Sequence, residues 1–177
     1  MKGSDNMRIL GLGAHPDDLE INCGGTLARF HQLGHQVVMA FACSGDKGHF
    51  RIPPAELAEI RKQEAQEAAA VIQAKSIWLG YQDGEIVGES LQNRDIFIDL
   101  IRQVQPDLIL THSPVDYHAD HTAVSRLVVD AAFMSTVPHL KTRYPALNDV
   151  PQIYFIEPYG GMAFQPDVYV ISNPHIL

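Results

Sequence analysis

Short apolar runs alternate with longer segments along the chain, and this alternation predicts strands and helices in turn. Four runs are apolar almost throughout, which is typical of buried strands: residues 8–13, 36–43, 77–80 and 107–113. Four longer segments are predicted to be helices: residues 17–33, 54–74, 91–104 and 119–132. The first of them carries apolar residues at three- to four-residue spacing, and Gly34 stands where a helix C-cap belongs. The late runs QIYFIE (152–157) and DVYVIS (167–172) predict two further strands.

The order of these elements predicts an α/β fold. Because several strands are apolar on both sides, the sheet should be mostly parallel and covered by helices on both faces. Right-handed crossovers then give a Rossmann-like, doubly wound sheet, for which we expect the strand order 3-2-1-4-5. Such folds bind ligands at the carboxyl ends of the strands, near the point where strand order reverses. We predict one domain over residues 7–177, preceded by a short tail of residues 1–6.

The stretch AHPDD (14–18) places a histidine and two adjacent carboxylates directly after the first predicted strand. Pro16 suits the first turn of a helix, and Asp17 and Asp18 would interact favourably with the helix dipole there. Helix capping therefore explains the carboxylates but not His15. His15 and Asp18 can converge across a strand-to-helix corner, and imidazole nitrogen and carboxylate oxygen are common zinc ligands. Asp17 would then point in another direction than Asp18 and remain free for a role other than metal binding.

The stretch DYHADH (116–121) follows the fourth predicted strand. His118 and His121 are three residues apart and share one face if they are helical, with Asp120 between them. By itself the stretch is compatible with an exposed helix start that is capped by Asp116 or Asp120. The predicted topology places it across the crevice from AHPDD, however. Together the two stretches predict a divalent-metal site with an open coordination position.

A dinucleotide-binding turn is the competing interpretation of the first stretch. Gly11 and Gly13 begin a GxGxxG pattern, but Pro16 occupies the third glycine position, which normally lets helix and strand pack closely. Asp17 and Asp18 would also repel a pyrophosphate at the helix N-terminus. We therefore reject a dinucleotide cofactor.

Composition narrows the expected partners and location. Thirteen basic and 21 acidic residues give a net charge of −8, which repels phosphate backbones, so we expect no nucleic-acid partner. No apolar run approaches the ~20 residues of a membrane span, and the N-terminus lacks a signal-peptide pattern. Cys23 and Cys43 are too few for a disulfide scaffold and are expected to be reduced and buried. These features predict a cytoplasmic protein.

The stretches AHPDDLEINCGGTLA and DYHADH resemble the PIG-L/LmbE-like zinc-dependent N-acetylglucosaminyl deacetylases. CSGDKG after the second strand, Arg61 and Glu64 in the second helix, and LGYQDG after the third strand extend the resemblance over nearly the whole chain. The resemblance implies that His15, Asp18 and His121 hold Zn2+, with another divalent metal such as Fe2+ as the alternative.

The resemblance also implies roles for four other polar residues. Asp17 matches the general base that activates water, and His118 matches the residue that assists the oxyanion or the leaving amine. Asp120 matches the carboxylate that orients His118 and should raise its pKa. Arg61 matches a position associated with substrate contact.

These roles imply a zinc-dependent hydrolase that removes an acetyl group from the N-acetyl amide of an N-acetylglucosamine-type sugar conjugate. That small-molecule conjugate is the expected partner, and relatives imply a homo-oligomer, a trimer or a hexamer. The alternative is a non-catalytic or inactive sugar- or metabolite-binding module on the same scaffold. The loops at 46–54 and 133–151 are expected to shape the choice of aglycone. Family members continue past the strand that residues 167–172 resemble, so this chain is expected to be short at its C-terminus.

Several other residues keep two interpretations. His112 is either a structural histidine or a neighbour of the site, and we favour the structural interpretation. His49 either reaches the rim of the cleft or is a solvated loop residue. Trp78 and the turn at 81–84 could line a sugar pocket, but a core tryptophan beside a turn is favoured.

Overall fold

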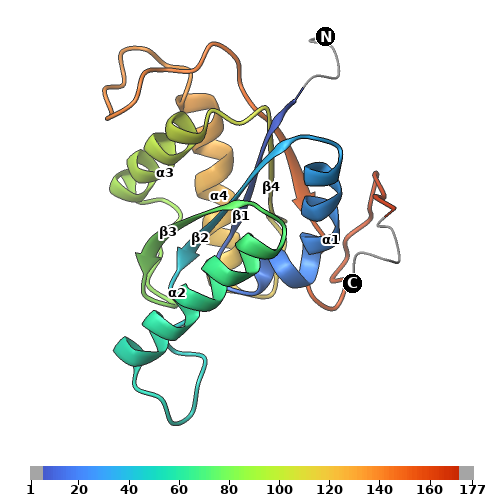
Figure 1. The fold of residues 1–177 in the computed structure, drawn as a ribbon. Helices are drawn as coiled ribbons and strands as arrows, with labels where there is room; N and C mark the ends of the chain where they lie inside the picture. The colour runs from blue at the N-terminus through green and yellow to red at the C-terminus, as the bar shows by residue number, and fades with distance from the viewer. Residues whose placement is uncertain (1–5, 172–177) are drawn as a thin grey trace.

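The computed structural model describes residues 6–171, and Figure 1 shows a sheet with helices on both faces. The strands are β1 (Arg8–Gly13), β2 (Gln36–Cys43), β3 (Lys75–Tyr81), β4 (Leu108–His112) and β5 (Gln152–Ile156). Neighbouring strands are parallel, in the order β3-β2-β1-β4-β5. The predicted α/β fold and strand order are therefore confirmed. Residues 1–5 of the predicted tail and residues 172–177 lie outside the described part of the chain.

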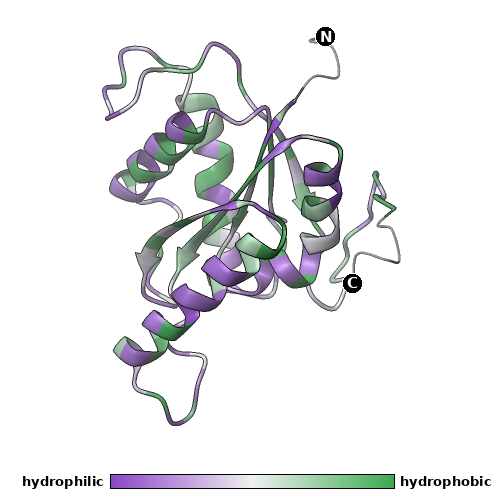
Figure 2. Cartoon of the chain, viewed as in Figure 1, coloured by the Kyte–Doolittle hydropathy of each residue, from purple (hydrophilic) through white to green (hydrophobic). Residues whose placement is uncertain are grey.

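Within residues 6–171, four helices cover the two faces of the sheet: α1 (Asp18–Gln32), α2 (Pro54–Val71), α3 (Leu91–Val104) and α4 (Ala119–Met134). Successive strand residues point to opposite faces. Ile9 of β1 therefore belongs to the same apolar cluster as Leu19 and Leu27 of α1, whereas Leu10 belongs to the cluster that contains Ile101 of α3. Figure 2 shows the strands as largely hydrophobic and the helices as partly hydrophilic, because each helix keeps one face in water.

The hydropathy of the helices and the burial of the cysteines match what the composition predicts. None of the four helices in the described residues combines the length and the hydropathy needed to cross a membrane. Cys23 and Cys43 are both buried and free of disulfide bonds. Burial raises the pKa of the Cys23 thiol to about 12, so it stays protonated at neutral pH and behaves as a small apolar residue.

α1 approaches β1 closely, and the two glycines of β1 allow this approach. A Cβ atom on Gly13 would lie 3.1 Å from Leu19 Cγ, and one on Gly11 would lie 3.2 Å from Leu19 Cδ1. Both distances are shorter than an optimal carbon–carbon contact. The close packing holds the first turn of α1, with Asp17 before it and Asp18 in it, directly beside the end of β1.

The strand predicted at DVYVIS is wrong for the residues that are described. Residues 167–171 are irregular, and Val168, Tyr169 and Ile171 are exposed; Ser172 lies outside the described part. The other late strand, QIYFIE, does form β5. Alternating apolar residues resemble a strand in both segments. Only the first of them pairs its backbone groups with a sheet edge, which is the condition for a strand.

Arg102 of α3 fixes the beginning of the loop between α4 and β5. Its side chain is buried and donates hydrogen bonds to four carbonyl oxygens, those of Ser135 at 2.9 Å, Val137 at 2.8 Å, Leu140 at 2.8 Å and Tyr144 at 3.4 Å. These carbonyls belong to the C-terminal end of α4 and to the residues after it, where a positive charge also interacts favourably with the helix dipole.

The loop 135–151 lies at the amino ends of the strands, far from the predicted site. α4 starts after β4 and runs back along the sheet, so its last residue reaches the opposite edge. There the N–H of Gln152 donates to the carbonyl of Asp107, just before β4 begins. Figure 1 shows this loop, in orange, at the end of the sheet where β1 begins. The expectation that residues 133–151 shape the choice of aglycone is therefore wrong.

We expect Arg102→Met to destabilise the protein strongly. The methionine fills part of the space but donates no hydrogen bond, so the Leu140 carbonyl loses its donor and those of Ser135 and Val137 keep only the N–H groups of Leu147 and Leu140. Losing these charge-assisted hydrogen bonds should cost roughly 3 kcal/mol in the free energy of unfolding. Urea unfolding should show a lower midpoint with an unchanged slope. The exposed pair of Arg126 and Asp130 provides the control, because Arg126→Met should change stability by less than about 1 kcal/mol. Equal midpoints for the two variants would contradict this role of Arg102.

Candidate metal site and active-site cavity

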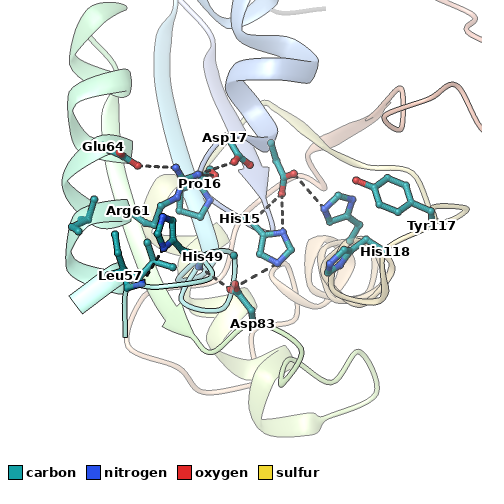
Figure 3. A pocket seen from close by; sticks show the side chains of 16 residues that line it. His15, Pro16, Asp17, His49, Leu57, Arg61, Glu64, Asp83, Tyr117 and His118 are labelled. Atoms are coloured by element: carbon teal, nitrogen blue, oxygen red, sulfur yellow. Dashed lines mark hydrogen bonds and ion pairs between the residues drawn. The ribbon is translucent and has the colours of Figure 1, made fainter. Parts of the chain in front are cut away.

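The two polar stretches meet at the carboxyl edge of the sheet, as the predicted topology requires. AHPDD joins β1 to α1 and DYHADH leads from β4 into α4, and β1 and β4 are neighbours in the sheet. A cavity of about 480 Å³ opens beside these two corners. The loop after β2, one side of α2 and Asp83 complete its lining (Figure 3).

Asp18 lies at the centre of a cluster of histidines. Its Oδ1 is 3.3 Å from His121 Nε2, and its Oδ2 is 3.5 Å from His15 Nδ1 and 3.2 Å from His112 Nε2. Burial by itself would raise the pKa of Asp18, but hydrogen bonds with the three imidazoles hold it well below its usual range. The carboxylate is therefore ionised, and it is a negative centre surrounded by nitrogen donors.

This donor set fits a divalent metal ion. Within the described residues, donor atoms approach one another within 4.8 Å in three groups: His15–His118–His121, Asp18–His112–His121 and His15–Cys43–Asp83. His121 belongs to the first two groups, and His15 belongs to the first and the third. Imidazoles combined with a carboxylate are the ligands that zinc and non-haem iron use in proteins. None of these groups contains all three predicted ligands, but Asp18 lies 3.5 Å from His15 and 3.3 Å from His121, so the structure places the three side chains beside one another.

Asp120 contacts a different histidine from the one that the sequence suggested. Its Oδ2 lies 2.9 Å from His15 Nε2 and accepts a hydrogen bond from the N–H of Gly84 at 2.8 Å. Burial opposes a charge on His15, but Asp120 and Asp18 outweigh it and raise the pKa of His15 to about 10. Asp120 is two residues from His118 in the sequence, but the fold turns its carboxylate toward the corner after β1.

His118 is oriented by the backbone. Its Nδ1 accepts a hydrogen bond from the N–H of Asp120 at 3.1 Å, so the neutral ring carries its proton on Nε2. Burial and the nearby His15 and His121 lower the pKa of His118, although Asp120 acts in the opposite direction. Asp120 thus acts on the pKa of His118 in the expected direction, but the expected raised pKa is wrong in this structure, because burial and the two neighbouring imidazoles outweigh it.

Asp17 faces the cavity from a different side than Asp18. Its backbone φ is 108°, in the left-handed region, and this turn separates the two neighbouring carboxylates. Its Oδ2 lies 2.7 Å from Nη2 of Arg61, which reaches over from α2 and also donates to Glu64 at 2.7 Å (Figure 3). Burial raises the pKa of Asp17 more than Arg61 lowers it. Asp17 is thus a carboxylate with an increased affinity for a proton, outside the cluster around Asp18.

His112 and Asp83 belong to the surroundings of the site. His112 accepts a hydrogen bond from the N–H of Ala14 at 2.9 Å, stacks on His121 with ring centroids 3.9 Å apart and touches Asp18. It is therefore both structural and a neighbour of the cluster. Asp83 lines the cavity 3.9 Å from His15 Nε2. The turn at 81–84 that contains Asp83 is one that the sequence suggested as a possible pocket lining, and its place after the third strand of a parallel sheet favours that interpretation.

The structure also decides between the two interpretations of His49 and of Trp78. The loop after β2 does border the cavity, through Gly48, His49 and Ile52. Trp78 does not line it and packs near Phe41, with ring centroids 6.4 Å apart, so the core interpretation of Trp78 holds.

Comparison with models of protein families assigns this chain to a family. The model of the family described as "PIG-L: GlcNAc-PI de-N-acetylase" matches residues 10–132, which include both polar stretches. The chain therefore belongs to the PIG-L family. The resemblance of AHPDD and DYHADH to this family is confirmed.

Relatives with named activities cover most of this chain. The 1D-myo-inositol 2-acetamido-2-deoxy-alpha-D-glucopyranoside deacetylase of Streptomyces avermitilis is 27% identical over 88% of the chain and 63% of its own length. The structure of N,N'-diacetylchitobiose deacetylase from Pyrococcus horikoshii is 26% identical with a TM-score of 0.80, and covers 88% of this chain and 62% of its own. The chain thus spans less than two thirds of either deacetylase.

The same fold also carries another reaction. GalB, the 4-carboxy-2-hydroxymuconate hydratase of Pseudomonas putida KT2440, superposes with a TM-score of 0.82 over 92% of this chain and 71% of its own, at 23% identity. This likeness concerns the fold alone. The reaction has to be argued from the residues of the site.

Proposed function

We propose that this chain is a zinc-dependent hydrolase that removes the acetyl group from the N-acetyl amide of an N-acetylglucosamine-type sugar conjugate. One observation carries the proposal. A carboxylate outside the Asp18 cluster, that of Asp17, faces the same cavity as the His15–Asp18–His121 donors. The named activities of the two deacetylase relatives support the substrate class. Zn2+ is the proposed metal, and Fe2+ would suit the same donors.

His15, Asp18 and His121 would hold the metal. A bound metal ion polarises a carbonyl oxygen and lowers the pKa of water in its coordination sphere. Asp17 takes the proton of the attacking water as that water adds to the amide carbon. Its raised pKa suits a group that must accept a proton and then release it.

His118 would stabilise the oxyanion that forms when water adds. Its Nδ1 is occupied by the Asp120 N–H, which leaves the Nε2–H of the neutral ring as a hydrogen-bond donor. The lowered pKa supports a neutral donor in preference to an imidazolium. The C–N bond then breaks, the proton held by Asp17 passes to the leaving nitrogen, and acetate and a free amine depart.

The remaining lining suits a sugar. Asp83 offers carboxylate oxygens for hydroxyl groups, and Arg61 offers guanidinium donors beside Asp17. Ile52, Leu57 and Ile60 form an apolar wall on the α2 side, against which a carbohydrate face or an aglycone can pack. We therefore propose that Arg61 contacts substrate while it holds Asp17.

Product analysis tests the proposed function. Zinc-loaded protein is incubated with a panel of N-acetylglucosamine conjugates that differ in aglycone, and acetate and free amine are quantified. Equal amounts of acetate and amine from at least one conjugate are expected. Tight binding of a conjugate without acetate release would favour the alternative, a non-catalytic sugar-binding module on this scaffold.

His49 is expected to contribute to substrate binding rather than to chemistry. Its Nδ1 accepts hydrogen bonds from the N–H groups of Arg51 at 3.1 Å and Ile52 at 3.0 Å, so the neutral ring has Nε2–H as its donor. Figure 3 shows the ring at the α2 side of the cavity, near Arg61. His49→Ala should raise KM about tenfold with little change in kcat, because binding energy common to substrate and transition state is lost. His139→Ala, in the distant loop, is the control, and an unchanged KM in His49→Ala would refute the role.

A further inference from the structure

The ring of His121 lies between two carboxylates. Its Nε2 is 3.3 Å from Asp18 Oδ1, and its Nδ1 is 3.1 Å from Asp116 Oδ1. The side chain of Asp116 is 0% exposed and that of His121 is 5% exposed. One nitrogen thus faces the proposed metal ligands, and the other faces a carboxylate that is completely removed from water.

Helix capping does not account for this carboxylate. α4 begins at Ala119 with His118 as its N-cap, so Asp116 lies before the cap. Its Oδ1 accepts the N–H of His118 at 3.0 Å, which orders the turn into α4. The approach to His121 Nδ1 is a separate contact. Within the described residues, Asp116 Oδ2 and His121 Nδ1 are both buried without an aligned hydrogen-bond partner.

Two such buried atoms on neighbouring side chains are costly unless they serve each other. His121 Nδ1 is already 3.1 Å from the other oxygen of the same carboxylate, Oδ1, and a small rotation of the ring or the carboxylate aligns an N–H···O hydrogen bond. In that arrangement the proton of the neutral imidazole is on Nδ1, and the Nε2 lone pair points toward Asp18. Metal-binding histidines commonly donate their second N–H to a carboxylate in this way.

We propose that Asp116 is a positioning residue that holds His121 in the Nδ1–H tautomer and aims Nε2 at the metal. The inference rests on the proposed metal site and extends it, because neither the sequence motif nor the cavity lining assigns Asp116 to the site. His15 has the same arrangement, with Asp18 at one nitrogen and the buried Asp120 at the other. Each of the two proposed histidine ligands therefore contacts a separate buried carboxylate through the nitrogen that faces away from Asp18.

Zinc affinity tests the proposal without any need for turnover. Metal-free wild-type protein and Asp116→Asn are titrated with Zn2+ in competition with a chromogenic chelator. The amide oxygen of asparagine can still accept the His118 N–H, so the turn into α4 is retained. The negative charge behind His121 is lost, and we expect zinc affinity to fall about 10–100-fold. Asp107→Asn is the matched control, because its carboxylate also accepts a backbone N–H, that of Arg8 at 2.8 Å, but at the opposite edge of the sheet.

Imidazole 15N NMR of the zinc-loaded wild-type protein provides a second readout that needs no variant. His121 is expected to show a protonated Nδ1 and a metal-bound Nε2. The opposite pattern, or wild-type zinc affinity in Asp116→Asn, overturns the role of Asp116 alone. A wild-type chain that binds no zinc overturns the proposed metal site, and the role of Asp116 with it.

Discussion

Asp17→Asn is expected to retain zinc and to lose about 10²–10⁴-fold in kcat. The amide has nearly the same shape as the carboxylate but cannot accept a proton from water. Zinc is retained because Asp17 lies outside the His15–Asp18–His121 cluster and its carboxylate contacts Arg61 instead. Zinc content and acetate release are measured on the same preparation.

Glu64→Gln is the matched control for this variant. Glu64 is the other carboxylate that binds Arg61, at 2.7 Å, and it also lines the cavity. A loss that came only from an altered Arg61 would be seen in both variants. A near-normal kcat in Asp17→Asn would remove Asp17 from the role of base, and a loss of zinc would make it a ligand.

His121→Ala is expected to abolish stoichiometric zinc binding. His121 belongs to two of the three groups of converging donors and contacts Asp18 through Nε2. Its removal takes away one of three proposed ligands and the ring that stacks on His112. Zinc content after dialysis of the refilled protein is measured by mass spectrometry, with circular dichroism to confirm the fold.

The control for this variant is His139→Ala, which removes a histidine from the loop at the far edge of the sheet. It should leave one zinc per chain. An unchanged zinc content in His121→Ala would mean that the metal is held by a different set of donors, such as a set that includes His112.

The position of the site could be predicted from sequence because it depends on topology. Apolar runs identified the strands, and the rule for right-handed crossovers placed the ends of β1 and β4 side by side. The convergence of AHPDD with DYHADH follows from that arrangement. No long-range contact had to be known in advance.

The partners of individual carboxylates could not be predicted in the same way. Asp120 is only two residues from His118, yet its carboxylate contacts His15, 105 residues away along the chain. Asp116 suggested a helix cap, yet it approaches His121. Side-chain direction depends on how the two corners pack against each other, and residue spacing within one corner does not contain that information.

The error of predicting residues 133–151 beside the substrate has a simpler cause. α4 has 16 residues and rises by about 1.5 Å per residue, so it spans the sheet from the carboxyl edge to the amino edge. The connection that follows it must begin far from the site. Loops that follow strands, such as the one after β2, are the ones that reach the cavity.

The central claim is that the two stretches together form one metal site that supports amide hydrolysis. Titration of metal-free protein with Zn2+, while acetate release from an N-acetylglucosamine conjugate is followed, tests it most directly. We predict no turnover without metal, a linear rise in rate with added zinc, and a plateau at one zinc per chain. Acetate release that persists in the metal-free protein, or a folded protein that binds no zinc, would contradict the claim.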